Sequence, residues 1–93
     1  MSSSRDRKLR QPSKAYDPAT PEKRLLFAKC LRRLRSEGGY TQRDFARALG
    51  IDENRYGRYE RAEVEPTLTL LCRMSEVLRV SPNDLLGFVD DTC

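Results

Sequence analysis

Apolar residues first recur at helical spacing between residues 21 and 37. They stand at i, i+3, i+4 and i+7, which is one face of an amphipathic helix, and they are Phe27, Cys30, Leu31 and Leu34. Thr20 can cap this helix, and Pro21 suits its first position because the ring fixes a helical φ. Gly38 and Gly39 predict its end.

Two shorter helical patterns follow over residues 41–49 and 52–61. Thr41 with Asp44 three residues later resembles a capping box, and Asp52 can cap the second helix. The inward positions of the pair are Phe45, Ala46, Leu49, Tyr56 and Tyr59. The sequence therefore predicts two helices whose buried faces meet.

The joint between these helices is very short, since only Ile51 lies between Gly50 and Asp52. Helices joined so tightly cross at a large angle, which needs a small residue at the contact and a left-handed residue at the turn. Ala46 and Gly50 meet these needs. The positions left facing outward are Glu53, Asn54, Arg55, Gly57, Arg58 and Arg61.

The last two patterns begin after Pro66 and after Val80. Thr67 can cap a helix whose broad apolar face holds Leu70, Leu71, Met74, Val77 and Leu78. Ser81 can cap a final helix with Pro82 at its first position, Asp84 at its third and Gly87 at its end. Five short helices with tight links and no strand pattern predict a compact all-α domain.

Charge divides the chain into three parts. Residues 1–19 are polar and basic, with five bases between Arg5 and Lys14, and predict a flexible N-terminal arm. Residues 20–89 form the predicted domain and residues 90–93 an acidic tail. Net charge is +4, with its excess toward the front of the chain. This distribution favours a polyanionic partner, although a solvated helix face and a disordered arm explain it equally well.

Several kinds of chemistry lack the residues they need. The chain has no histidine, and its three cysteines form no CxxC pair, so we expect no zinc site, no cofactor and no enzyme. Cys30 and Cys72 are expected as small core residues and Cys93 as an exposed one. No apolar run reaches the length of a membrane span, and no signal peptide is visible, which predicts a cytoplasmic protein without membrane contact.

Three stretches together carry a family resemblance: "TQRDFARALGI", "YGRYERAEVEP" and "LTLLCRMSEVLRVSPNDLLG". Over residues 23–88 the chain resembles the helix-turn-helix domain of the phage repressor and Cro family, also called XRE-like. Matching positions are Gln42, Ala46, Gly50, Glu60 and Pro66. The resemblance implies a lambda-repressor-like fold. Ala62 stands where the family has glycine, which disfavours the left-handed turn formed there.

The resemblance also implies roles for exposed residues. By this resemblance, base contacts fall to Glu53, Asn54 and Arg58, and a phosphate contact falls to Gln42. Three further arginines are placed for phosphates, which position the domain without specifying sequence, namely Arg43, Arg55 and Arg61. Arginine can bind guanine bidentately, and asparagine can bind adenine in the same way. Glutamate can accept a hydrogen bond from the amino group of cytosine. Gln42 would also brace the second helix of the pair, and Glu60 would pair with Arg35 or Arg47. The alternative for the exposed residues is an ordinary solvated helix face.

These expectations describe a sequence-specific, double-stranded DNA-binding protein, a small transcriptional regulator such as a repressor or an autorepressing antitoxin-like protein. A domain this small reads few base pairs, so we expect a homodimer on a palindromic operator. The expected dimer surface is Leu85, Leu86, Phe88 and Val89, unless Leu85 and Phe88 only close the core. The competing interpretation is a protein-interaction module without DNA binding, favoured by Glu53, Gly57 and the balanced charge of residues 52–61.

Overall fold

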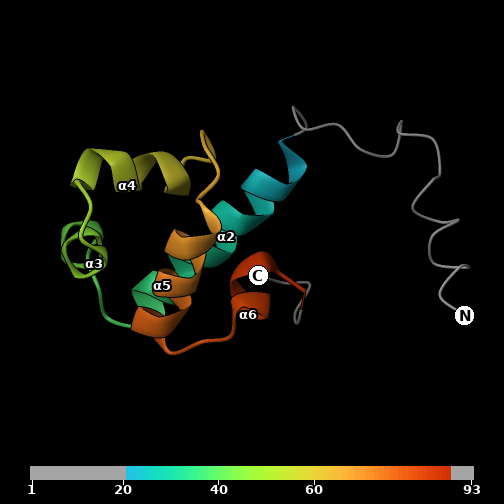
Figure 1. Ribbon diagram of the computed structural model, residues 1–93. Coiled ribbons are helices and arrows are strands. Elements are labelled where there is room, and N and C mark those ends of the chain that lie inside the picture. The colour runs from blue at the N-terminus through green and yellow to red at the C-terminus, as the bar shows by residue number, and fades with distance from the viewer. Residues whose placement is uncertain (1–20, 89–93) are drawn as a thin grey trace, which may run out of the picture.

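The computed structural model describes residues 21–88, and these fold into helices without a strand (Figure 1). In chain order the helices are α2 (Glu22–Glu37), α3 (Gln42–Leu49), α4 (Glu53–Glu60), α5 (Leu68–Leu78) and α6 (Pro82–Leu86). The all-α, five-helix expectation is confirmed for this range. The predicted arm over residues 1–19 and the tail over residues 90–93 lie outside the described residues, as do Thr20 and Val89.

The helices begin and end close to where the sequence predicts. α2 starts at Glu22, so Pro21 precedes the helix instead of opening it, and the Pro21 carbonyl accepts from the Leu25 N–H at 2.8 Å. The other starts have the expected caps, namely Thr41, Asp52, Thr67 and Ser81, each of whose side chains accepts a backbone N–H. Short polar caps thus fix the starts of α3 to α6, because they satisfy N–H groups that lack partners within the helix.

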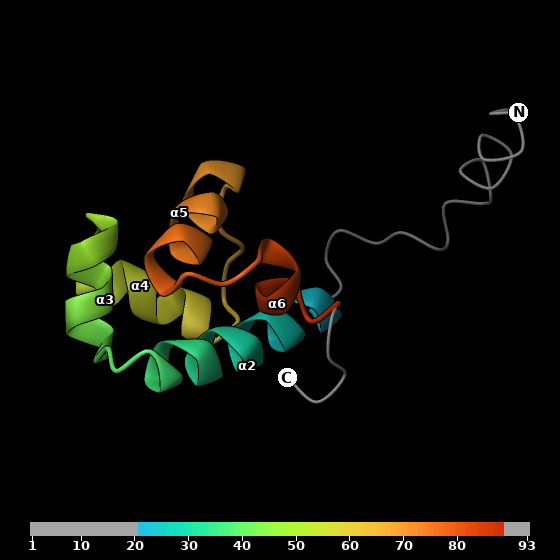
Figure 2. The same cartoon turned by 90° about the horizontal axis from the view of Figure 1, so that it is seen from below.

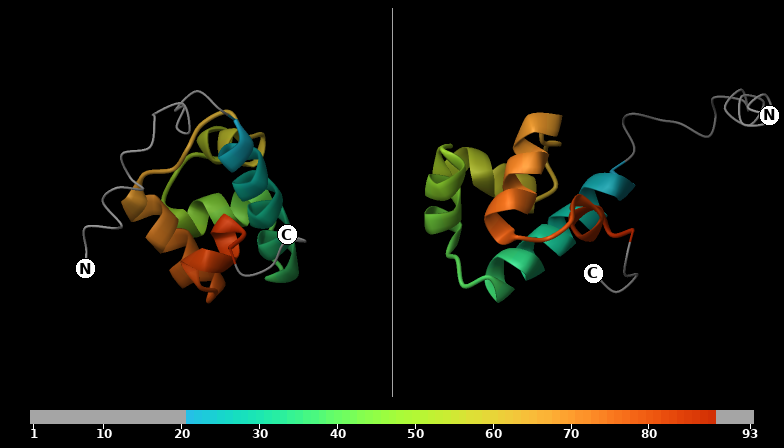
Figure 3. Two further views of the ribbon diagram at one scale, coloured as in Figure 1. Left: turned by 90° about the vertical axis from the view of Figure 1, so that its right-hand side faces the viewer. Right: turned by 60° about the horizontal axis from the view of Figure 1, so that its bottom comes forward.

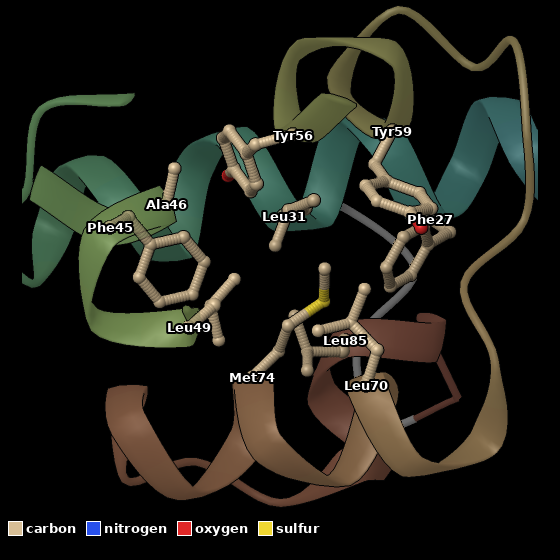
Figure 4. Packing of buried hydrophobic residues seen from close by; sticks show 10 residues of the cluster. All are labelled: Phe27, Leu31, Phe45, Ala46, Leu49, Tyr56, Tyr59, Leu70, Met74 and Leu85. Atoms are coloured by element: carbon tan, nitrogen blue, oxygen red, sulfur yellow. The ribbon is translucent and has the colours of Figure 1, made fainter. Parts of the chain in front are cut away.

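The core lies where α2, α3, α4 and α5 face one another, and α6 closes it (Figure 4). Its buried residues are Phe27, Leu31, Phe45, Ala46, Leu49, Tyr56, Tyr59, Leu70, Met74 and Leu85. Cys30 is buried, as expected, but Cys72 is exposed, and its core assignment was wrong. A turn of roughly 100° per residue places Cys72 far around the helix from Leu70 and next to exposed Arg73.

The helices divide between two ends of the molecule. α3 and α4 form one end, and α6 lies at the other, against α2 near the start of that helix (Figures 2 and 3). α2 spans both ends, since it also packs against α4. Within the described residues, no helix has the length and apolar character needed to cross a membrane. The shared scaffold is therefore α2, and the α3–α4 pair stands apart from the C-terminal helix.

Candidate nucleic-acid interface

The turn between α3 and α4 has the predicted geometry. Gly50 adopts a left-handed conformation with φ of 77°, and the Ile51 N–H donates to the Ala46 carbonyl at 3.0 Å. A Cβ on Gly50 would meet no atom within 4 Å, so the positive φ alone favours glycine here. Ala46 is buried at the contact. Figure 1 looks nearly along α3 while α4 lies across the view, so the two helices cross steeply.

α4 is held from beneath by two tyrosines. Tyr56 is fully buried and Tyr59 nearly so, as predicted from their spacing of three residues. The Tyr56 ring meets the Phe45 ring of α3 edge to face, with 5.3 Å between centroids. Asp52 caps the start of α4 by accepting from the N–H groups of Asn54 and Arg55. Aromatic packing and the cap together fix the position of this helix against α3.

A buried carboxylate joins three helices. Glu60, at the end of α4, is 3% exposed and accepts from Arg35 Nε of α2 at 2.6 Å and from Gln42 Nε2 of α3 at 2.7 Å. The Tyr56 hydroxyl also donates to it. Arg32 Nη1 donates to the Glu60 backbone carbonyl at 2.8 Å. The expected pairing of Glu60 with Arg35 or Arg47 is resolved in favour of Arg35.

The charge state of this network follows from its contacts. Burial raises the pKa of Glu60, but hydrogen bonds from Arg35, Tyr56 and Gln42 outweigh it and leave that pKa lowered. The bond to Glu60 raises the pKa of Arg35. Burial, followed by the bond to Glu60, raises the pKa of Tyr56. Glu60 is therefore ionised and acts as a structural anchor for α4.

The outer face of α4 presents the polar residues expected from the sequence. Glu53, Asn54, Arg55 and Arg58 are exposed, as are Arg61 just after the helix and Arg43 on α3. Gln42 is half-buried and braces α4 through Glu60, so its alternative as a merely solvated side chain was wrong. These exposed side chains all lie on α3, on α4 or directly after α4.

Gly57 does not face outward, which corrects the sequence interpretation. It is buried, and a Cβ placed on it would lie 2.8 Å from Nη1 of Arg61. The guanidinium group of Arg61 therefore folds back over the bare Cα of the glycine. An alanine here would require this long side chain to move.

The turn after α4 also differs from the expectation that Ala62 would disfavour a left-handed conformation. Ala62 adopts a left-handed conformation with φ of 62°, so the family's turn forms without its glycine. The turn is closed by a bond from the Glu63 N–H to the Arg58 carbonyl at 2.9 Å. A left-handed alanine is strained relative to glycine, and the closing hydrogen bond helps to hold it.

Sequence reasoning missed Glu63. Its carboxylate lies 2.8 Å from Arg61 Nε and 3.5 Å from Arg58 Nε, so one acid meets two arginines of the predicted contact set. The bond from Arg61 lowers the pKa of Glu63, with a smaller contribution from Arg58. The signal available in the sequence was the spacing, since Glu63 stands two residues after Arg61 and five after Arg58. A left-handed turn at Ala62 brings such an acid back toward the end of the helix. Among the described residues, no group of acidic or cysteine side chains could hold a metal ion.

Comparison with known proteins shows which family this chain resembles. The model of the HTH_3 helix-turn-helix family matches residues 31–85. The chain is 39% identical over 61 residues to the SPbeta prophage-derived uncharacterized HTH-type transcriptional regulator YonR of Bacillus subtilis. That alignment covers 66% of this chain and 56% of YonR. The chain is 37% identical over 63 residues to the HTH-type transcriptional regulator ImmR of the same organism, at 68% and 50% coverage. The chain thus spans about half the length of these two relatives.

Solved structures agree with the sequence relatives. The restriction-modification controller protein C.AhdI of Aeromonas hydrophila superposes with a TM-score of 0.63 at 27% identity, covering 67% of this chain and 94% of that one. The hypothetical transcription factor NHTF from Neisseria gives 0.65 at 25% identity, with 76% and 83% covered. The family match spans more than half of the chain and includes the turn at Gly50 and the buried Glu60. This chain belongs to the HTH_3 helix-turn-helix family.

Proposed function

We propose that the chain binds double-stranded DNA sequence-specifically and regulates transcription, as a repressor or an autorepressing antitoxin-like protein. The observation that carries this proposal is α4 itself, a helix with a polar outer face on a base fixed by Tyr56, Tyr59 and the Glu60 network. Such a helix suits the major groove, which admits one α-helix. Family membership and two relatives named as HTH-type transcriptional regulators support the same function.

Within this proposal the exposed residues have distinct tasks. Asn54 and Arg58 would read adenine and guanine, and Glu53 would accept from a cytosine amino group. Arg43, Arg55 and Arg61 would contact phosphates, which position the domain without specifying sequence. Gln42 already uses Nε2 to hold Glu60, and its amide can direct a second N–H to a phosphate. Bracing and phosphate contact are therefore compatible tasks for this residue.

Site selection from random DNA tests the proposal. The wild-type chain should enrich one motif, and Asn54→Ala or Arg58→Ala should each relax one position of that motif by about 1–3 kcal/mol. Arg73→Ala, an exposed arginine on α5 outside the helix pair, is the matched control and should leave the motif unchanged. A motif that survives both α4 substitutions would remove the base-reading assignment.

The arm is proposed to add phosphate contacts. Deleting residues 1–14 should weaken binding to every sequence alike and should flatten the dependence of log K on log salt by about 0.9 per lost contact. A changed motif after the deletion would instead make the arm a reader of bases. Titration of several DNA sequences at four salt concentrations measures both the affinity for each sequence and the slope of log K against log salt.

We propose a homodimer on a palindromic operator, with a dimer surface of fewer residues than the sequence suggested. Leu85 is fully buried, so it closes the core and cannot form an interface. Leu86 packs partly on the core, while Phe88 is 68% exposed, and Val89 lies outside the described residues. Sedimentation of the wild type and of Phe88→Glu tests this surface. Monomers throughout, with equal affinity for a half-site and a palindrome, would contradict the dimer.

One observation favours a protein-interaction module as a second candidate. The exposed residues between 41 and 65 include five arginines and five carboxylates, so the exposed part of this segment has no excess positive charge. DNA-binding faces usually carry such an excess, because phosphate contacts supply much of the affinity. Failure to enrich any DNA at low salt would favour the second candidate over the first.

A further inference from the structure

Two arginines of the proposed DNA face converge on one carboxylate. Arg61 Nε lies 2.8 Å and Arg58 Nε 3.5 Å from the two oxygens of Glu63. All three side chains are about half exposed, at 54%, 59% and 46% for Arg58, Arg61 and Glu63. A phosphate can therefore reach either guanidinium group, but only in competition with Glu63.

The backbone builds this arrangement, so it does not depend on chance meetings of long side chains. The left-handed conformation of Ala62 and the bond from the Glu63 N–H to the Arg58 carbonyl return the chain toward the end of α4. The absent side chain of Gly57 leaves room for the Arg61 guanidinium, which would lie 2.8 Å from a Cβ there. Three local features of residues 57–63 thus bring the charged groups together.

We propose that Glu63 is a specificity-determining residue that weakens binding to non-cognate DNA more than binding to the operator. The proposal rests on the proposed function and assigns Glu63 a part in it. Non-cognate DNA offers these arginines only phosphates, and exchanging the Glu63 carboxylate for a phosphate replaces one exposed ion pair with another. The net gain from such an exchange is small.

The operator offers more than charge. Guanine presents two acceptors to one guanidinium group in a fixed geometry, so Arg58 gains a bidentate contact on the correct base. When Arg58 leaves Glu63 for guanine, Arg61 Nε can keep its contact with Glu63 while the Nη groups of Arg61 meet a phosphate. Glu63 also limits the conformations of Arg58 before DNA arrives, which lowers the entropy lost on binding. Competition from Glu63 therefore weakens the binding of non-specific DNA more than the binding of the operator.

The test compares Glu63→Gln with Glu65→Gln. Both variants remove one negative charge from the same exposed turn, but Glu65 forms no ion pair with an arginine in the part of the chain that the structure describes. Each protein is titrated with a random-sequence duplex and with a duplex selected by the wild type, over a series of salt concentrations. Arginine Nε–Hε resonances of ¹⁵N-labelled protein report the ion pairs without DNA.

Glu63→Gln should bind the random duplex about two- to five-fold tighter per released pair, with a steeper salt dependence. Its affinity for the selected duplex should rise less, so the specificity ratio should fall. The Arg61 Nε–Hε resonance should shift, while the thermal midpoint stays near that of the wild type. Glu65→Gln should leave the ratio and the resonance unchanged.

The outcomes separate this inference from the proposed function. If the wild type binds both duplexes and Glu63→Gln keeps the same ratio, or changes it no more than Glu65→Gln does, the role of Glu63 is wrong and DNA binding stands. If neither the wild type nor Glu63→Gln binds any duplex at low salt, both proposals fail. Binding of the random duplex by Glu63→Gln alone would support Glu63 as the residue that suppresses it.

Discussion

The substitution Glu60→Gln should destabilise the domain strongly, because it removes the charge that joins α2, α3 and α4. The shape of the side chain is nearly kept, so packing changes little. The carboxylate accepts from Arg35 and Gln42 at 2.6 and 2.7 Å and also from Tyr56. A glutamine offers one oxygen in its place and turns an NH₂ group toward donors that need an acceptor.

The size of the effect follows from burial on both sides of the ion pair. Glu60 is 3% exposed, and the Arg35 side chain is 17% exposed. Removing one partner of a buried pair costs about 3–5 kcal/mol. Arg35 keeps its bond to the Tyr40 carbonyl at 2.8 Å and reaches some solvent, so we expect about 2–3 kcal/mol of lost stability. Native domains have a free energy of unfolding of about 5–15 kcal/mol, so the loss is large.

The stability of the wild type should also depend on pH through this group. Because the pKa of Glu60 is lower in the folded state than in the unfolded state, the native protein binds fewer protons. The contribution of Glu60 is full above the unfolded value of about 4.3 and is lost as pH falls through the folded value. Glu60→Gln has no such group, so the stability difference between the two proteins should shrink below about pH 4.

Urea unfolding followed by circular dichroism, at pH values from 7 to 2.5, measures both effects. The matched control is Glu37→Gln, whose ion pair with Arg33 is solvent-exposed, at 42% and 58% exposure of the two side chains. We expect about 0.5 kcal/mol or less for that control. Parallel pH profiles for the wild type and Glu60→Gln below pH 5, or equal costs for the two glutamine variants, would refute the anchoring role of Glu60.

Two further substitutions test the geometry of the helix pair by thermal unfolding. Ala46→Leu should overpack the crossing of α3 and α4 and cost about 1–3 kcal/mol, since Ala46 is 1% exposed, and an unchanged midpoint would contradict close packing there. Ala62→Gly should raise stability by about 0.5–1 kcal/mol, because glycine adopts the φ of 62° without strain but loses more entropy on folding. A destabilised Ala62→Gly variant would show that the entropy cost of glycine exceeds the strain of this turn.

The sequence predicted those features that are set by a few neighbouring residues. The caps at Thr41, Asp52 and Thr67 each depend on groups two or three positions away, and all were found. The left-handed turn at Gly50 and the inward tyrosines of α4 are equally local. Helical period and terminal chemistry are sufficient for such elements.

The errors arose where the outcome depends on how elements lie in space. Cys72 counted as apolar, but the side of α5 that faces the core is decided by α3 and α6, not by the residue type. Leu85 was expected at a dimer surface, with closure of the core as the alternative, and α6 turns it into the core. Gly57 was expected on the outer face, but the guanidinium group of Arg61, four residues later, lies over it, and the rotamer of a long side chain cannot be predicted from spacing.

The length of α4 links the buried network to the proposed function. The helix has only eight residues, and isolated helices shorter than about 12–15 residues are marginal in water. It contains Gly57, which costs about 1 kcal/mol relative to alanine in a helix interior. Its outer side chains face solvent and contribute little to its stability, so its position depends on Asp52, the two tyrosines and Glu60. Changes to Glu60 should therefore weaken DNA binding in proportion to lost fold, whereas changes to Arg58 should alter base preference in a fully folded domain.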